Sequence, residues 1–569
     1  MDTPYGEIPE RFAKDMAPDE MFEFLQKRYS RRRILKGAAV AGALAVSGPI
    51  FWRRSYAFAS TTPSPTGPQW IAFGPDPTSE MYISWAAGNS TTAANVPAPK
   101  VRWGLDTSYG ATLDAASGQV PTPGGGTAEL TSYQHALLRR LTPDTTYHYS
   151  VSNDGVTWGP DTTFTTGKAG VVDFRFAATG DENSFATSSG PIMQSIASFQ
   201  PDFTIVAGDL SYASDDGTYF GTGTPMSYSP ADWDSYFAVL GPSAGQSIPW
   251  MVGPGNHDVE PFLDNGFAGL ITRFPHFGTT AANSGSGSKV VQSFTYGNVG
   301  FIGLDDSDVS TLDTVNNGYT AGAQTTWFEE KLQKFRSPGA GIDFIVVFFH
   351  HCPYCSGGPG SDGGDRTVWQ PLFDAYDVDL VINGHNHLYE RVYPLINNVI
   401  QATPAPGDTV DPSKVGTTYI CTGGGGQSLA ASATSGWNGS SGGGDLASGA
   451  GTPAPVIEVY SGGEKATGGS GSTEQEPDPV TGWSAYRRAQ YCHLIIDVTA
   501  PTTHRGATSM HVQAIDPTQS GSTISSITPP EMVMDSITLT RTSVTGPAGH
   551  HGLGGGHRLS TRLFANPVA

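Results

Sequence analysis

The stretch Phe203-Thr-Ile-Val-Ala-Gly-Asp-Leu-Ser-Tyr212 is a short, largely apolar run that ends abruptly in glycine and aspartate. A run of this length without polar alternation is typical of a strand buried on both faces, as in the sheets of α/β proteins. The polar residues begin where the strand is expected to end. The stretch therefore predicts a buried strand that delivers Asp209 and Tyr212 to the edge of a sheet.

The same pattern recurs through the middle of the chain. The expected strands are Phe174–Ala178, Phe203–Ala207, Trp250–Val252, Val299–Leu304, Phe344–Phe349 and Leu380–Ile382. Five of the six are followed by metal-binding residue types, which are Asp181, Asp209, Asn256-His257, His350-His351 and His385-Asn-His387. Ile192, Ile196 and Phe199 share one helical face between the strands, as do Phe328, Leu332 and Phe335. Open α/β sheets place their active sites at the carboxyl ends of strands, so we expect one site there.

The residue types favour hard metal ions. Carboxylate and amide oxygens, imidazoles and a phenol suit two ions about 3.5–4 Å apart that share one carboxylate. Asp209 is the natural bridge, because it follows a strand directly and Tyr212 lies one short turn further on. The imidazoles of His385 and His387 point the same way if their segment is extended, or diverge to two metals around a turn.

Residues 68–167 have a different texture, with short alternating runs separated by turn residues. Examples are Met81–Trp85, Lys100–Trp103 and Tyr147–Val151. This spacing predicts an all-β sandwich. The segment Leu141–Tyr149 resembles the corner of fibronectin type III domains, in which a tyrosine locks a strand turn, and Trp85 is the expected core tryptophan. Residues 60–67 are expected to be a linker.

Composition limits the partners. The chain has 569 residues with 72 glycines, 42 prolines and a net charge of −21. This favours an all-β or α/β protein rich in loops, and an acidic surface that does not suit nucleic acid backbones or anionic membranes. Any phosphate specificity must then be local, created by bound cations.

The first 59 residues resemble a twin-arginine export signal. Ser30-Arg-Arg-Arg-Ile-Leu-Lys36 precedes an apolar stretch from Gly37 to Trp52, and Ala57-Phe-Ala59 fits a cleavage site before Ser60. We expect the twin-arginine translocase as an export partner and an extracellular, periplasmic or cell-wall location. The alternative is a single membrane anchor, but the run is shorter than the roughly 20 residues that a span needs.

The four cysteines leave several possibilities open. Cys352-Pro-Tyr-Cys355 could close a small ring and Cys421 could join Cys492, although four cysteines allow three pairings. A zinc or redox role for the CxxC pair is the alternative, but no second CxxC is present to complete a zinc site.

Two regions are expected to lack a fixed structure. Residues 423–477 are dominated by Gly, Ser, Ala and Thr and predict a flexible insertion. Gly423–Gly426 lacks the Lys-Ser/Thr of a phosphate loop, which argues against a nucleotide site. The tail 541–569 is expected to be disordered.

The ordered set of motifs resembles that of the purple acid phosphatases, in the calcineurin-like metallophosphoesterase superfamily. The motifs are Gly180-Asp181, Gly208-Asp209-Leu-Ser-Tyr212, Gly255-Asn256-His257-Asp258, Val347-Phe-Phe-His350 and Gly384-His385-Asn-His387-Leu-Tyr-Glu-Arg391. The resemblance covers about residues 68–540. It implies an α/β, four-layer β-sandwich metallophosphoesterase domain over 172–540, preceded by the fibronectin-like sandwich.

The resemblance also implies roles for individual residues. Fe(III) would be bound by Asp181, Asp209, Tyr212 and His387, and a divalent ion (Fe, Zn or Mn) by Asp209, Asn256, His350 and His385. His257 and His351 would be catalytic residues beside the phosphate, with His351 as an alternative to His350 as ligand. The implied reaction is attack of a metal-bound hydroxide on a small phosphate ester, without a covalent protein intermediate.

Two departures from the family pattern concern acid catalysis and substrate choice. Glu182-Asn183 follows Asp181 where the family has a small residue and Gly, and no histidine lies between Cys355 and Tyr376, where plant members carry one. Arg366 or Asp365 is a possible substitute. The predicted function is a secreted phosphomonoesterase. The alternatives are a phosphodiesterase or nucleotidase of the same superfamily and a binding protein with a degenerate metal domain.

Overall fold

A computed structural model describes most of the chain between residues 66 and 543. The described residues are 2–3, 6–7, 66–121, 129–184, 188–214, 228–261, 265–278, 284–355, 360–429, 483–488, 490–503, 506–517 and 532–543. Apart from the short strands β1 (Asp2–Thr3) and β2 (Gly6–Glu7), the predicted signal lies outside these residues, as do most of the insertion and nearly all of the tail. No helix in the described ranges is both long enough and apolar enough to cross a membrane.

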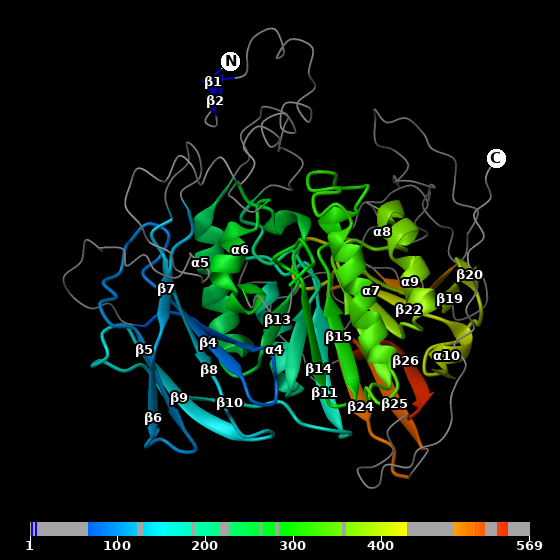
Figure 1. Ribbon diagram of the computed structural model, residues 1–569, viewed down its shortest axis with the longest axis horizontal. Helices are drawn as coiled ribbons and strands as arrows, with labels where there is room; N and C mark the ends of the chain where they lie inside the picture. The colour runs from blue at the N-terminus through cyan, green and yellow to red at the C-terminus, as the bar shows by residue number, and fades with distance from the viewer. Residues whose placement is uncertain are drawn as a thin grey trace.

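Two seven-stranded sheets form the centre of the molecule (Figure 1). The first has the order β13 (Trp250–Val252), β12 (Phe203–Val206), β11 (Phe174–Thr179), β24 (His493–Thr499), β25 (Ala507–Asp516), β26 (Met532–Thr542) and β21 (Thr409–Val410). The second has the order β14 (Gln292–Tyr296), β15 (Val299–Gly303), β16 (Phe344–Phe348), β17 (Leu380–Asn383), β22 (Thr418–Thr422), β18 (Tyr389–Val392) and β23 (Ser484–Arg488). Strands β11–β13 run parallel to one another, as do β15, β16, β17 and β22. All six predicted strands are present, with ends that differ by at most one residue.

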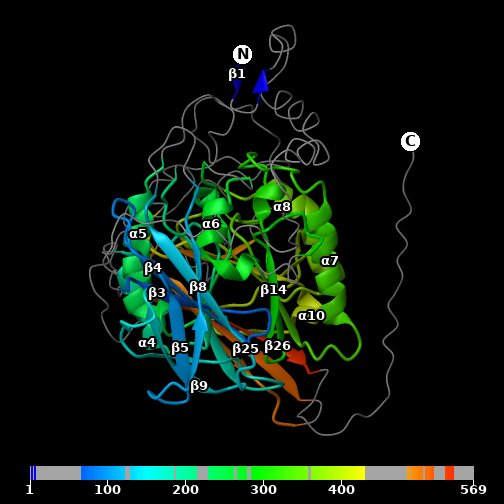
Figure 2. The ribbon, with the colours of Figure 1, turned by 60° about the vertical axis from the view of Figure 1, so that its left-hand side comes forward.

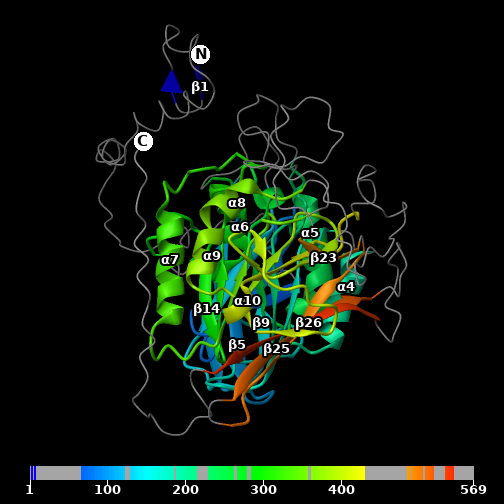
Figure 3. The same ribbon diagram turned by 90° about the vertical axis from the view of Figure 1, so that its right-hand side faces the viewer.

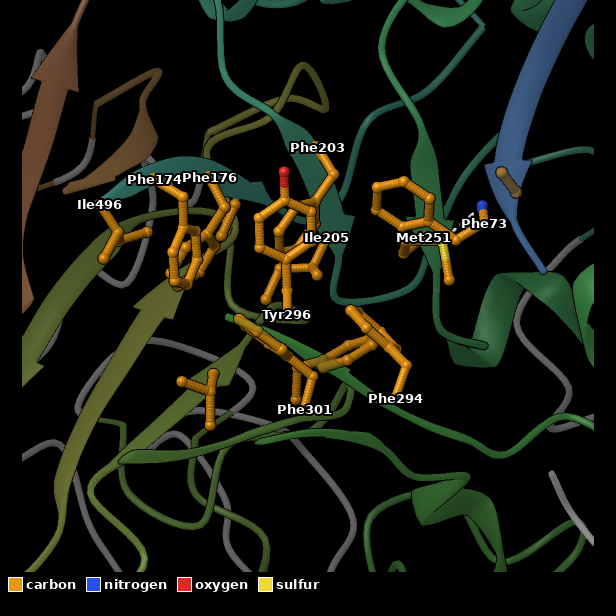
Figure 4. Close-up of a cluster of buried hydrophobic side chains, with 14 of the residues drawn as sticks. Phe73, Phe174, Phe176, Phe203, Ile205, Met251, Phe294, Tyr296, Phe301 and Ile496 are labelled. Atoms are coloured by element: carbon orange, nitrogen blue, oxygen red, sulfur yellow. Dashed lines mark hydrogen bonds between the residues drawn. The ribbon is translucent and has the colours of Figure 1, made fainter. Parts of the chain in front are cut away.

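The two sheets pack face to face through aromatic side chains. Phe176 on β11 meets Phe301 on β15 edge to face, with ring centroids 5.1 Å apart, and Phe203 on β12 meets the same ring at 5.2 Å (Figure 4). Alternate residues of β16 divide between two cores: Phe344, Val346 and Phe348 face the other sheet, whereas Ile345 and Val347 face outward. The uninterrupted apolar runs are therefore explained by burial on both faces.

Helices cover the outer face of each sheet (Figure 3). Helices α4 (Ser189–Ser198) and α5 (Pro230–Leu240) pack on the first sheet, and α7 (Ala323–Arg336) and α9 (Gln370–Ala375) on the second. The predicted four-layer α/β architecture is confirmed. One detail differs, because α4 ends at Ser198 and Phe199 is its C-terminal cap residue.

Shorter elements connect these layers. They are η4 (Gly241–Gly245), η5 (Asn256–Asp258), α6 (Ala268–Arg273), η6 (Pro275–Gly278), η7 (Asp306–Asp308), α8 (Gly363–Val368), β19 (Leu395–Ile396), β20 (Val399–Ile400) and α10 (Pro412–Val415).

The N-terminal domain is all-β, with two four-stranded antiparallel sheets (Figure 2). One contains β3 (Gln69–Phe73), β4 (Met81–Ala87), β8 (Ser132–Leu138) and β7 (Ala116–Gly118), and the other β10 (Thr162–Thr165), β9 (Thr146–Ser152), β5 (Lys100–Gly104) and β6 (Ala111–Asp114). Trp85 is fully buried. The hydroxyl of Tyr147 accepts a hydrogen bond from the backbone N–H of Thr142 at 2.9 Å, which ties a strand to the preceding turn.

A buried ion network joins this domain to the larger one. Arg273 at the end of α6 donates to Glu129 at 2.7 Å and to both carboxylate oxygens of Glu260 at 2.9 Å, and all three side chains are almost inaccessible. Nearby, the ring of Trp70 stacks on Phe237 with centroids 4.0 Å apart. The two domains thus share one buried interface.

Replacing Arg273 by Ala should strongly destabilise the protein. Loss of the guanidinium leaves the buried carboxylates of Glu129 and Glu260 without their cation, which costs about 3–5 kcal/mol. The unfolding midpoint in urea measures the effect. Replacing Lys100 by Ala is the control. Its ion pair with Asp114 is solvent-exposed, so the loss should lower the free energy of unfolding by less than about 1 kcal/mol. Equal midpoints for the two variants would contradict this account of the interface.

Candidate metal centre

The carboxyl ends of strands from both sheets meet at one edge of the molecule. Asp181, Asp209 and Asn256 follow β11, β12 and β13 of the first sheet, while His350 and the His385–His387 segment follow β16 and β17 of the second. One ligand atom from each of Asp181, Asp209 and His350 lies within 4.8 Å of the others. The structure therefore brings residues from five strand ends into one buried site.

Asp181, Tyr212 and His387 form one half of this site. The hydroxyl of Tyr212 lies 3.1 Å from Asp181 Oδ1 and 3.1 Å from His387 Nε2, and the latter two atoms are 3.3 Å apart. The Nδ1 atom of His387 is held at 2.7 Å by the carbonyl oxygen of Ser428. Because a carbonyl only accepts, this contact puts a proton on Nδ1 and leaves the Nε2 lone pair facing the site.

Asp209, Asn256, His350 and His385 form the other half. The Nε2 atom of His350 lies 2.8 Å from Asn256 Oδ1 and 3.2 Å from Asp209 Oδ2, and His385 Nδ1 lies 3.1 Å from the same amide oxygen. The carbonyl oxygen of Ala207 holds His350 Nδ1 at 2.8 Å, so Nε2 is again the atom directed into the site. The segment carrying His385 and His387 is a turn, and its two imidazoles diverge to the two halves.

The local backbone is strained where the ligands sit. Asp181, Asp209, Tyr212 and His385 have φ angles of 58°, 56°, 55° and 65°, a region that non-glycine residues adopt only at a cost. At Gly255 a Cβ atom would lie 2.2 Å from Asp209 Oδ1, so only glycine allows this carboxylate its position. The tight turns place the side chains immediately after the strands.

Asp258 supports the turn that carries Asp209. Its carboxylate accepts hydrogen bonds from the backbone N–H groups of Asp209 and Gly255 at 2.9 Å and of Leu210 at 3.2 Å. The carboxylate of Asp209 in turn accepts the N–H of His257 at 2.9 Å. These reciprocal bonds fix the loops after β12 and β13 relative to each other.

The pKa shifts of two residues of the site, Asp209 and His385, favour cation binding. Burial alone would raise the pKa of Asp209, but the neighbouring His350 and His257 outweigh it and lower that pKa below the usual value. Burial, together with His351 and His350, lowers the pKa of His385 well below normal, which favours the neutral imidazole that a metal requires. Two buried site atoms, Asp181 Oδ2 and His385 Nε2, have no hydrogen-bond partner within the described part of the chain. This donor set fits bound metal ions.

The two predicted catalytic histidines lie beside this donor set. The ring of His257 lies 4.3 Å from that of Tyr212, and its Nδ1 is held at 2.9 Å by the carbonyl oxygen of Ser214. The ring of His351 lies 4.2 Å from that of His385, and its Nδ1 lies 3.0 Å from Asp306 Oδ2. The Nε2 atom of His351 has no partner among the described residues.

Part of the predicted insertion belongs to the site. Gly423–Gly426 is buried, and Gly425 donates its N–H to the carbonyl of Gly180 at 3.0 Å. A Cβ at Gly423 would lie 2.9 Å from Asp181 Oδ2. The prediction that the flexible insertion begins at residue 423 is therefore wrong, since the glycines allow close packing here; residues 430–482 lie outside the described ranges. Sequence reasoning missed this segment because its composition alone resembles a linker.

The residues connected with the two departures from the family pattern, which are Glu182-Asn183 and Asp365-Arg366, are packed in the interior. Glu182 is buried and accepts a hydrogen bond from the hydroxyl of Tyr236 at 2.7 Å, and burial raises the pKa of its carboxyl to about 7. Asn183 donates to the carbonyl of Gly426 at 3.0 Å. Asp365 and Arg366 are buried in α8, where the guanidinium lies 5.4 Å from the ring centroid of Tyr354.

The four cysteines are buried, and none of them forms a disulfide in this structure. The suggested pairs Cys352–Cys355 and Cys421–Cys492 are therefore not disulfides here. Instead, the sulfur atom of Cys421 lies close to those of both Cys352 and Cys355.

Comparison with known protein families agrees with the geometry. Residues 174–389 match the model of the calcineurin-like phosphoesterases, and residues 69–166 match that of the purple acid phosphatase N-terminal domain. The uncharacterized protein Rv2577 of Mycobacterium tuberculosis is 32% identical over 446 residues, which is 71% of this chain and 79% of that protein. Purple acid phosphatase 23 of Arabidopsis thaliana is 27% identical over 390 residues, covering 63% and 79% of the two chains.

Two solved structures share the fold. The purple acid phosphatase PPD1 from yellow lupin seeds superposes with a TM-score of 0.55 at 18% identity, over 84% of this chain and 75% of that one. PhoD superposes with a TM-score of 0.51 at 12% identity, over 84% and 90%.

Proposed function

Because this chain belongs to the purple acid phosphatases, within the calcineurin-like phosphoesterases, and is a metal-dependent phosphoric ester hydrolase, we propose that it is a binuclear-metal acid phosphatase acting on phosphate monoesters. The main support is the convergence of Asp181, Asp209 and His350, with their ligand atoms within 4.8 Å of one another. The rival function, a binding protein with a degenerate metal domain, finds no support in a site that keeps every proposed ligand.

The two halves of the site suggest two metal positions. We assign Fe(III) to Asp181, Asp209, Tyr212 and His387, since a phenolate suits this ion, and a divalent ion (Fe, Zn or Mn) to Asp209, Asn256, His350 and His385. Asp209 belongs to both sets, as a shared carboxylate must. Ions bound in this way supply Lewis-acid activation of the ester and of the attacking water.

Two histidines beside the donor set, His257 and His351, can handle the protons of the reaction. The contact between His257 Nδ1 and the Ser214 carbonyl fixes one proton on Nδ1, so the second proton of an imidazolium would lie on Nε2, from which it can be donated to a substrate oxygen. His351 is oriented by Asp306 in the same manner, with its Nε2 available. These two residues are the candidates for the acid role of the histidine that plant relatives carry between positions equivalent to Cys355 and Tyr376.

Substrate preference tests the proposal directly. The purified enzyme should hydrolyse p-nitrophenyl phosphate with a higher kcat/KM than bis(p-nitrophenyl) phosphate. Replacing Asp209 by Asn should lower the monoester rate by about 10²–10³-fold, the size expected when one electrostatic stabilising group is lost. Turnover of the diester alone would replace the proposal by a phosphodiesterase function.

Replacing Tyr212 by Phe should abolish a visible absorption band. A phenolate bound to Fe(III) gives a charge-transfer transition, and Phe has no oxygen to bind. Replacing Tyr236 by Phe is the matched control: this buried tyrosine donates to Glu182 and should not contribute to the band. Absorption spectra of the two variants, with iron content measured alongside, provide the comparison. A band that survived in Tyr212→Phe would refute the assignment of this ligand.

We also propose export through the twin-arginine translocase, from the sequence of residues 30–59. Replacing Arg31, Arg32 and Arg33 by Lys preserves the charge but should retain the precursor in the cytoplasm. N-terminal sequencing of the exported protein should give Ser60 as the first residue. Unchanged export of the lysine variant would exclude this pathway.

A further inference from the structure

Three of the four cysteines form a cluster that phosphate ester hydrolysis does not use. Cys352 and Cys355 lie in the loop after β16, and Cys421 lies in β22, about 70 residues further along the chain. All three are almost fully buried, and their sulfur atoms lie within 4.8 Å of one another. The fourth thiol, that of Cys492, is not part of the group.

We propose that Cys352, Cys355 and Cys421 bind a zinc ion, separate from the binuclear centre. Thiolate sulfur selects soft and borderline metals, whereas the binuclear centre offers only oxygen and nitrogen. Four tetrahedral ligands at the usual Zn–S distance of about 2.3 Å place sulfur atoms about 3.8 Å apart. The three sulfur atoms lie within 4.8 Å of one another, so they need to move only a short distance to reach that geometry.

Glu390 is the candidate fourth ligand. Its Oε2 lies 3.3 Å from Cys355 Sγ, close to the separation of about 3.5 Å expected for a sulfur and an oxygen bound to the same tetrahedral zinc. Glu390 is fully buried in β18, and the register of β18 with β23 sets it opposite the buried Arg487. The group whose ligand atoms lie within 4.8 Å of one another contains only the three sulfur atoms, so Glu390 completes the set by moving its carboxylate from Cys355 toward the other two.

Charge balance favours a divalent ion over Cu(I). Three thiolates and one carboxylate carry four negative charges in a region that water does not reach. Zn²⁺ and the guanidinium of Arg487 offset three of them, whereas a monovalent ion would leave one more charge uncompensated, which is costly in a buried place.

The cluster lies directly against the loop that presents the histidine ligands. The thiol of Cys352 donates to the carbonyl of Gly384 at 3.1 Å, and the sulfur atom of Cys421 lies 3.3 and 3.2 Å from the carbonyl oxygens of Gly384 and Asn386, to either of which its one proton can be donated. A bound zinc would take the place of these thiol protons. It would tie the loop after β16 to β22, on either side of the segment that carries His385 and His387.

Sulfur-specific spectroscopy distinguishes this site from the binuclear centre. The enzyme substituted with Co²⁺ should show sulfur-to-cobalt charge-transfer absorption in the near ultraviolet, because no binuclear ligand contains sulfur. As purified, the parent should hold one more zinc per chain than Cys421→Ser, whichever divalent ion occupies the binuclear centre. Cys492→Ser is the matched control, since this buried thiol lies outside the cluster, and it should keep both the absorption and the zinc.

Thiol counting covers the case in which Cys421→Ser fails to fold. The parent enzyme, denatured with chelator but without reductant, should take up four alkyl groups by intact mass, whereas a disulfide would limit it to two. A disulfide, or four thiols with no zinc outside the binuclear centre and no charge-transfer band, would overturn the proposal.

Discussion

The face-to-face packing of two sheets is the constraint on which the site depends. Neither sheet holds a complete ligand set: the first supplies two carboxylates, a phenol and an amide, and the second supplies three imidazoles. The rings of Phe176 and Phe203 on one sheet close on Phe301 of the other at 5.1 and 5.2 Å. These contacts fix the distance between the layers, so the strand ends of both sheets arrive at the same edge. Close packing of this kind leaves the sheets little freedom to slide, and contacts between the loops, such as that of His350 with the Ala207 carbonyl, then fix the individual side chains.

The sequence revealed those features of the fold and site whose signals are local. A strand such as Phe203–Val206 is recognisable because both of its faces are buried, and Asp209 stands out because a polar residue follows the strand at once. The groups that hold the ligand side chains in place could not be predicted from the sequence. Asp258 acts through three backbone N–H groups, two of them in a loop almost 50 residues earlier, and the carbonyls of Ala207 and Ser428 set the histidine tautomers. Backbone groups have no residue identity, so no sequence pattern could single them out.

The cysteine cluster also could not be predicted from the sequence, for a related reason. Cys352 and Cys355 form a visible half-motif, and the absence of a second CxxC argued against zinc. The missing sulfur comes from β22, which pairs in parallel with β17 so that Cys421 is set opposite Asn383. Parallel pairing requires a long connection between the strands, and no short-range spacing records its register. A ligand set divided between a loop and a neighbouring strand therefore becomes recognisable only once the sheet is assembled.

The N-terminal domain is tied to the chemistry through the same kind of long-range support. Glu129 of that domain and Glu260 of the larger one share the guanidinium of Arg273, and Glu260 also accepts the indole N–H of Trp233 at 2.5 Å. Glu260 lies only two residues beyond Asp258, whose carboxylate fixes the turn of Asp209, the proposed bridge. An uncompensated charge at Glu260 would thus arise within one short loop of a proposed metal ligand. The β domain is in this sense part of the structural support of the proposed metal site, since removing it would take Glu129 away from Arg273 and expose the remaining Arg273–Glu260 pair next to the Asn256–Asp258 turn.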